Sequence, residues 1–231
     1  MSITHWCVIP AAGSGARFGG DIPKQYVEVA GRSILLHTLD ALLSHPRIAG
    51  AIVALSAGDA LWPVSLSDMH GKPVRTCIGG TSRAASVTNA LAALLAEVSD
   101  DDAVLVHDAA RPNVSHADLD ALFAALDSHL QGAILAAPVR DTLKRADDSG
   151  DIAATEPRDK LWRAFTPQAF PRGLLAKALV DAASAGIDVT DEAMAMERIG
   201  IHVRLVEGSE DNFKITTPAD LARFEFMVSR R

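Results

Sequence analysis

The most informative segment of the sequence is Pro10-Ala-Ala-Gly-Ser-Gly-Ala-Arg-Phe-Gly-Gly-Asp-Ile-Pro-Lys-Gln-Tyr26, which continues a short apolar run, His5–Pro10. Small residues at positions 11 to 16 let the backbone approach a ligand closely and direct N–H groups at it. Arg17 and Lys24 add two positive charges to the same loop. A buried strand that opens into a cationic, glycine-rich loop predicts an α/β protein with a polyphosphate site after its first strand.

Short apolar runs alternate with longer amphipathic stretches along the rest of the chain. The short runs are typical of buried parallel strands. The longer ones carry helix-start signals, such as Ser115 with Asp118 and Thr217-Pro218 with Asp220. This alternation predicts a doubly wound, mostly parallel, Rossmann-like sheet with ligands at the carboxyl ends of its strands. The predicted strands are 5–10, 51–55, 74–78, 103–107, 133–137 and 202–206.

Composition narrows the class of protein. The chain has 231 residues, 48% of them hydrophobic, and contains no linker or low-complexity run, so we expect a single domain over 1–231. A net charge of −7 with scattered basic residues argues against nucleic acid as a partner. No apolar run reaches the roughly 18 residues that span a bilayer. We expect no membrane association and a cytoplasmic protein, with Cys7 and Cys77 as buried free thiols.

A polar segment, about 138–168, breaks the alternation. Its two limbs, 140–145 and 152–156, flank an acidic turn and can pair as a β-hairpin. The segment is either a solvent-exposed excursion or an arm that embraces a partner subunit. The residues alone favour the exposed excursion.

Several interpretations of the first loop compete. A plain strand-to-helix turn does not explain the paired cations. A dinucleotide fingerprint requires Gly-x-Gly-x-x-Gly, but the third glycine of Gly13, Gly15 and Gly19 comes one residue late. The acidic residue expected about 20 positions later is also missing, since Asp40 lies in an apparent helix. A Walker loop requires Gly-Lys-Ser/Thr, which is absent. A nucleotidyltransferase loop remains.

Two further segments follow predicted strands. Gly79 to Val87 is either a glycine turn with a serine cap or a second ligand loop, in which Ser86 donates to a base. In the segment Val106 to Pro112, Asp108 is placed to hold Mg²⁺ beside phosphates or simply to cap a turn.

Together these segments resemble the 2-C-methyl-D-erythritol 4-phosphate cytidylyltransferase family, within the sugar-nucleotidyltransferase superfamily. The motifs run in the family's order and cover nearly the whole chain. They are Pro10-Ala-Ala-Gly-x-Gly-x-Arg17, Pro23-Lys-Gln-Tyr26, Gly79-Gly-x-x-Arg83-x-x-Ser86-Val87, His107-Asp-Ala-Ala-Arg-Pro112, Pro138-Val-Arg-Asp-Thr142, Thr166-Pro-Gln168, Thr190-Asp-Glu192 and Asn212-Phe-Lys-Ile-Thr216.

The resemblance implies transfer of CMP from CTP to 2-C-methyl-D-erythritol 4-phosphate, with release of pyrophosphate, in the non-mevalonate route to isoprenoids. It implies Mg²⁺ as cofactor, held at Asp108, and a homodimer whose hairpin arms interlock. That raises the arm interpretation of 138–168 above the exposed excursion. The family also occurs fused to a cyclodiphosphate synthase, and 231 residues leave no room for one, so we expect a monofunctional chain.

The resemblance also implies residue roles. Arg17 and Lys24 stabilise the pentacoordinate phosphorus, while Arg158 and Lys214 position the attacking phosphate; a shift in alignment would put Arg163 in place of Arg158. Residues implied in the alcohol-phosphate pocket are Arg111, Thr142, Thr166 and Thr190. Residues implied around CTP and its metal are Ala11, Ala12, Gly13, Gly15, Gly80, Ser86, Asp108 and Ala109.

The implied chemistry needs no general base, because the attacking phosphate is already an anion. Positioning and charge stabilisation should dominate catalysis. We therefore expect a structural role for His107, the only histidine in a motif. The alternative functions are a ribitol-5-phosphate cytidylyltransferase, an NAD(P)-dependent oxidoreductase and a non-catalytic nucleotide-sensing module.

Overall fold

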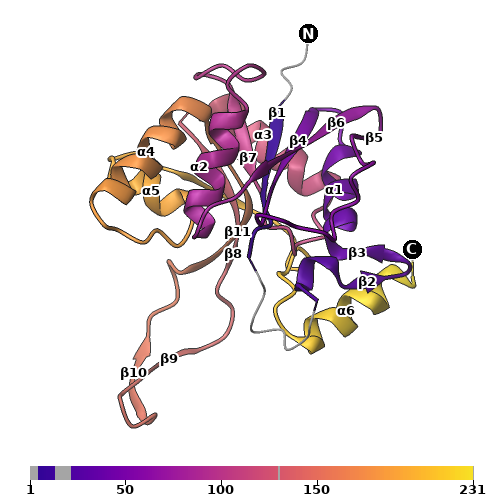
Figure 1. Cartoon of the computed structure of the whole chain (residues 1–231). Helices are drawn as coiled ribbons and strands as arrows, with labels where there is room; N and C mark the ends of the chain where they lie inside the picture. The colour runs from indigo at the N-terminus through magenta and orange to yellow at the C-terminus, as the bar shows by residue number, and fades with distance from the viewer. Residues whose placement is uncertain (1–4, 14–21, 130, 231) are drawn as a thin grey trace.

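An eight-stranded mixed sheet forms the centre of the computed structural model, which describes residues 5–13, 22–129 and 131–230 (Figure 1). The strand order is β12-β8-β11-β7-β1-β4-β6-β5. The strands are β1 His5–Pro10, β4 Ile48–Leu55, β5 Asp68–Met69, β6 Lys72–Ile78, β7 Ala103–Val106, β8 Ala133–Pro138, β11 Trp162–Pro171 and β12 Arg204–Glu207.

The central strands are parallel. β1 pairs in parallel with β4 and β7, and β4 pairs in parallel with β6. The carboxyl ends of β1, β6 and β7 therefore meet at one edge of the sheet, where ligands bind in folds of this kind. β11 is antiparallel to both β7 and β8. The predicted α/β fold with a mostly parallel, doubly wound sheet is confirmed.

Helices cover both faces of the sheet (Figure 1). They are α1 Ile34–Leu43, α2 Arg83–Ala93, α3 His116–Ser128, α4 Arg172–Ser184, α5 Glu192–Arg198 and α6 Pro218–Val228, with a short 3₁₀ turn, η2, over Lys24–Tyr26. Leu39 of α1 and Phe123 of α3 belong to the core of one face. Val87 of α2 and Leu175 of α4 belong to the core of the other. These four helices thus bury apolar residues in the cores on the two faces of the sheet.

Side chains cap the starts of α2, α3 and α6. Ser115 and Asp118 form a capping box at α3, and Thr217 and Asp220 form one at α6, as their spacing predicted. Ser82 caps α2 by accepting from the Ala85 N–H. These caps satisfy backbone donors that a helix start leaves unpaired.

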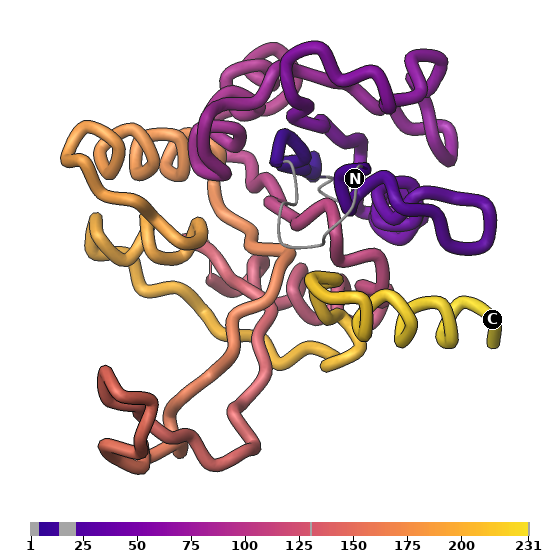
Figure 2. Tube along the Cα trace, turned by 60° about the horizontal axis from the view of Figure 1, so that its bottom comes forward, coloured from indigo at the N-terminus to yellow at the C-terminus, as the bar shows by residue number. Residues whose placement is uncertain are grey.

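The hairpin predicted inside the polar segment is present and projects from the body of the molecule (Figures 1 and 2). β9, Leu143–Ala146, pairs antiparallel with β10, Ile152–Glu156. The expected segment extended to residue 168, but β11 already begins at Trp162 and is a strand of the central sheet. We missed β11 because Thr166 and Gln168 look like loop residues, whereas both are buried and hydrogen-bonded. The projecting arm is thus 139–161, between β8 and β11.

The remaining general expectations concern thiols and membranes. Both cysteines are free, but only Cys7 is buried; Cys77 is half-buried on β6, where the sheet nears its edge. Within the described residues, no helix is both long and apolar enough to span a bilayer.

Candidate active site

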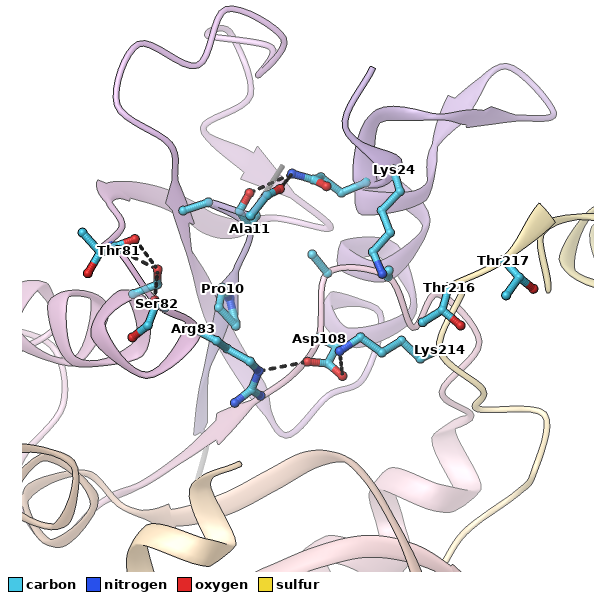
Figure 3. Close-up of a pocket in the computed structure, with 17 residues that line it drawn as sticks. Pro10, Ala11, Lys24, Thr81, Ser82, Arg83, Asp108, Lys214, Thr216 and Thr217 are labelled. Carbon is cyan, nitrogen blue, oxygen red and sulfur yellow. Dashed lines mark hydrogen bonds and ion pairs between the residues drawn. The ribbon is translucent and has the colours of Figure 1, made fainter. Parts of the chain in front are cut away.

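A cavity of about 820 Å³ opens at the carboxyl ends of β1, β6 and β7 (Figure 3). Parallel pairing brings together the loops that follow these three strands. The cavity is lined by Pro10, Ala11, Ala12, Gly13, Lys24, Gln25, Gly80, Thr81, Ser82, Arg83, Ser86, Asp108, Ala109, Ala110, Lys214, Thr216 and Thr217. Of the predicted site residues, Ala11, Ala12, Gly13, Lys24, Gly80, Ser86, Asp108, Ala109 and Lys214 meet here.

The first loop forms one wall of the cavity. The Ala11 N–H continues the pairing of β1 by donating to the Ala54 carbonyl at 2.8 Å. Lys24 reaches the cavity from η2, and its Nζ donates to the Ile215 carbonyl at 2.9 Å. Gly15 and Arg17, to which we assigned roles from the sequence, lie outside the described residues.

The second loop closes on itself through Ser86. The Ser86 hydroxyl accepts from the Gly80 N–H at 3.0 Å and donates to the Ser82 carbonyl at 2.9 Å. Gly79 packs so tightly that an added Cβ would lie 2.5 Å from the Ala12 Cβ. The two loops are therefore packed in direct contact. The Ser86 hydroxyl holds the conformation of the second loop in addition to lining the cavity.

Asp108 lies at the centre of a cluster of positive charges. Its Oδ1 accepts from Arg83 Nε at 3.2 Å, and its Oδ2 contacts Arg111 Nε and Lys214 Nζ, each at 3.1 Å. Arg83 and Lys214 approach it from opposite sides (Figure 3). Burial alone would raise the pKa of Asp108, but the three cations outweigh it and hold the pKa well below its usual range. The carboxylate is therefore ionised at neutral pH.

Arg83 and Glu192 form a second ion pair that we did not predict. Arg83 Nη1 and Nη2 contact the two Glu192 carboxylate oxygens at 2.6 and 3.0 Å. Glu192 is 1% exposed, and burial raises its pKa while Arg83 opposes that shift. Both residues stand in quoted motifs, but 109 positions separate them, so their contact requires the tertiary structure.

Beneath the cavity lies a chain of hydrogen bonds through His107. The Asp108 N–H donates to Thr166 Oγ1 at 3.0 Å, which contacts His107 Nδ1 at 3.0 Å; His107 Nε2 contacts the Arg111 carbonyl at 2.9 Å. The Arg111 carbonyl can only accept, so His107 carries a proton on Nε2. Burial lowers the pKa of His107 to about 4, so the ring is neutral and its Nδ1 accepts from the Thr166 hydroxyl. Arg111 also donates to the Asn212 carbonyl at 2.7 Å.

The residues expected around the alcohol phosphate are thus dispersed within one chain. Arg111 and Thr166 are buried beneath the cavity, while Thr142, Arg158 and Thr190 are exposed and do not line it. Arg158 lies on the arm, where its guanidinium donates to the Arg140 carbonyl. Arg163, the alternative, pairs with Glu210. One described chain does not assemble this half of the site.

The cavity offers one carboxylate for a cation. Asp108 is the only acidic residue in the described lining, and the described residues contain no cluster of three or more histidine, cysteine or acidic side chains. A Mg²⁺ that works with nucleotides commonly uses one or two carboxylates and completes its shell with water and phosphate oxygens. A single ionised carboxylate in a cavity that is also lined by Lys24 and Lys214 fits that donor set.

Comparisons with known proteins agree along the whole chain. The family model described as IspD, 2-C-methyl-D-erythritol 4-phosphate cytidylyltransferase, matches residues 6–230. A protein of that name from Stenotrophomonas maltophilia (strain R551-3) is 62% identical over 231 residues, which covers 100% of this chain and 99% of the relative. The crystal structure of the protein of that name from Francisella tularensis has a TM-score of 0.82 at 39% identity, over 96% of this chain and 99% of that one. A crystal structure of 4-diphosphocytidyl-2C-methyl-D-erythritol synthase has a TM-score of 0.83 at 34% identity, over 98% and 100%.

Proposed function

The chain belongs to the 2-C-methyl-D-erythritol 4-phosphate cytidylyltransferase family, and we propose that the cavity around Asp108 is its active site. The enzyme transfers CMP from CTP to 2-C-methyl-D-erythritol 4-phosphate in isoprenoid biosynthesis, with release of pyrophosphate. The observation that supports this cavity most strongly is that two glycine loops, Lys24 and Lys214 meet at the carboxyl ends of the central strands.

The two loops divide the nucleotide between them. Gly80 and Ser86 face the base, and the backbone from Ala11 to Gly13 faces the triphosphate. Backbone N–H groups suit this task because they are held rigidly and carry partial positive charge. Lys24 adds a full charge beside the phosphates, and Arg17 does the same from the part of the loop outside the described residues.

The transfer is a substitution at the α-phosphorus of CTP. An oxygen of the alcohol's phosphate forms a bond to this phosphorus, and the bond to the pyrophosphate oxygen breaks. The attacking phosphate monoester is already anionic, so no side chain has to remove a proton. Lys24 and Arg17 stabilise the negative charge on the pentacoordinate phosphorus, and Lys214 aligns the attacking phosphate.

Mg²⁺ is the cofactor that this donor set fits, and Asp108 would hold it. When bound, it would supply positive charge that neutralises the phosphates and helps to orient the triphosphate. Arg83, Arg111 and Lys214 keep the Asp108 carboxylate ionised, so it remains a ligand across the neutral pH range. The protein's own contribution is to fix the position of this carboxylate through the Thr166 hydrogen bond to its backbone.

The active enzyme is a homodimer in which each arm completes the partner's site. The arm, 139–161, is exposed along almost its whole length, and Ile152 on it is 68% exposed. Thr142 and Arg158 lie on this arm, away from the cavity of their own chain. In the dimer, Thr142 and Arg158 of one chain would reach the alcohol phosphate in the site of the other chain, where Arg111, Thr166 and Thr190 also contribute.

The free state of both thiols supports a cytoplasmic location.

Pyrophosphate release from CTP with each alcohol phosphate tests this function. We expect turnover with 2-C-methyl-D-erythritol 4-phosphate and far slower turnover with ribitol 5-phosphate. Faster turnover of ribitol 5-phosphate would overturn the substrate assignment. CTP binding without pyrophosphate release from either alcohol would indicate a nucleotide-sensing module instead.

A further inference from the structure

Gln25 connects the first loop to η2 at the wall of the cavity. Its side-chain Nε2 donates to the Ala11 carbonyl at 2.8 Å and to the Gly13 carbonyl at 3.0 Å. Only 5% of the residue is exposed, although it is one of the residues that line the cavity. Both hydrogens of this buried amide nitrogen are thus donated to backbone carbonyls of the first loop, called the nucleotide loop below.

These two bonds fix the direction of the loop's peptide groups. In a planar trans peptide the C=O and the following N–H point in opposite directions. Holding the Ala11 carbonyl toward Gln25 therefore turns the Ala12 N–H away from Gln25. The partial positive charge that backbone N–H groups present to a phosphate depends on such orientations. Reversed peptides would present carbonyl oxygens to the phosphate instead.

The side chains on either side of Gln25 connect η2 to two other segments of the chain. Lys24 Nζ donates to the Ile215 carbonyl at 2.9 Å, and the Tyr26 hydroxyl donates to Asp59 Oδ2 at 2.9 Å. Three consecutive residues thus anchor three separate segments. Because Lys24 and Gln25 share one short turn, the distance from the Lys24 ammonium to the nucleotide loop depends on the Gln25 bonds.

We propose that Gln25 is a positioning residue for the transfer, which sets both the peptide orientation of the nucleotide loop and the place of Lys24. This inference rests on the proposed function. Gln25 acts indirectly, through its hydrogen bonds to the Ala11 and Gly13 carbonyls, and does not contact the substrate. Small displacements at such a site are costly, since catalysis here is mostly alignment.

The isosteric variant Gln25→Glu tests the proposal. Near pH 8 the introduced carboxylate would face two carbonyl oxygens and donate to neither, so we expect the dissociation constant for CTP to rise about tenfold or more. We expect kcat to fall as well, because Lys24 shifts with η2. Burial among acceptors raises the pKa of the introduced carboxyl. As pH falls the protonated form regains one donor, so CTP binding should recover relative to wild type.

The control is Gln131→Glu, the same chemical change at an exposed position. It should leave CTP binding and its pH profile as in wild type. Calorimetric titration with CTP alone measures the dissociation constant for CTP in the absence of the alcohol substrate. Gln25→Asn, which keeps the amide one methylene further away, should give an intermediate loss; this variant carries the test if Gln25→Glu does not fold.

Wild-type CTP affinity and kcat in folded Gln25→Glu or Gln25→Asn would overturn the proposal. A lower urea midpoint with unchanged CTP affinity would do so too, because it would indicate a purely structural residue. Failure of the wild-type enzyme to release pyrophosphate would instead refute the proposed function, and the CTP titrations separate these outcomes.

Discussion

Lys24 combines a structural contact with a charge in the cavity. Its ammonium donates to the Ile215 carbonyl and faces the space assigned to the triphosphate. Lys24→Ala should lower kcat by about 10²- to 10³-fold, since one donor to a developing charge is worth about that much. The measurement is steady-state pyrophosphate release.

The matched control for this prediction is Lys177→Ala on the exposed side of α4. Both variants should keep the wild-type circular dichroism spectrum. Near-normal turnover in Lys24→Ala would remove it from the catalytic group.

At the residue scale, the sequence predicts the local parts of the site better than the distant pairings. The loop with Lys24 is one continuous motif, and parallel strands bring it to Asp108. The pairing of Arg83 with Glu192 joins the starts of α2 and α5, which no spacing rule connects. Burial of Arg111 was also not predictable, because its partner carbonyl belongs to Asn212, 101 positions away.

At the element scale, the contact between the two loops is set by one glycine. Gly79→Ala should push the nucleotide loop outward, because the new Cβ would lie 2.5 Å from the Ala12 Cβ. We expect the KM for CTP to rise about tenfold, since the backbone donors lose their alignment.

The double variant Ala12→Gly/Gly79→Ala removes the closest of these clashes and should recover part of the affinity. If the effects of the two single variants on the KM for CTP simply add in the double variant, the clash between the loops is not the cause of the loss.

The far end of the sheet carries a pH-sensitive contact. His5 stacks on Phe123 and its Nδ1 contacts the Ala103 carbonyl at 3.0 Å, with Arg47 and Asp127 nearby. Burial lowers the pKa of His5 below its ordinary value of 6.5. The unfolded chain therefore binds a proton more readily, so stability is full above 6.5 and declines as pH falls through the folded-state pKa.

We expect the urea midpoint of the wild type to fall between about pH 7.5 and about pH 5.5, because the unfolded chain protonates at His5 before the folded chain does. His5→Gln should show a smaller fall, whereas His202→Gln, at an exposed position, should match the wild type. Equal slopes in all three proteins would exclude His5 as the source.

Strand prediction succeeded for the apolar runs and for the mixed runs that became β6 and β12, but it missed β11. β1, β4 and β7 are continuous apolar runs and were recognised. β11 begins with exposed residues, Trp162–Ala164, and then buries polar side chains whose partners lie on other elements. Its pairing between two strands, not its composition, makes it a strand.

At the scale of the whole molecule, the proposed active site is built from two chains. Arg158 lies on the arm and Lys24 in the cavity, so in an isologous dimer they act in the same site from different chains. Mixing the inactive variants Lys24→Ala and Arg158→Ala should restore about a quarter of wild-type activity. Half of the dimers are then mixed, and each mixed dimer keeps one intact site.

Light scattering should give twice the chain mass of 24.4 kDa for every protein in that mixture. Arg163→Ala is the control, because Arg163 pairs with Glu210 of its own chain, and it should retain most activity. Absence of recovery after exchange of subunits would contradict the shared site.

The most direct test of the central claim follows the oxygen atoms through the reaction. If the phosphate of 2-C-methyl-D-erythritol 4-phosphate attacks the α-phosphorus of CTP, a substrate with oxygen-18 in that phosphate must give a product with oxygen-18 between its two phosphorus atoms. Phosphorus NMR of the products reads the position of the label. We expect a labelled bridge and unlabelled pyrophosphate; label in the pyrophosphate or an unlabelled bridge would contradict attack by the phosphate of the substrate.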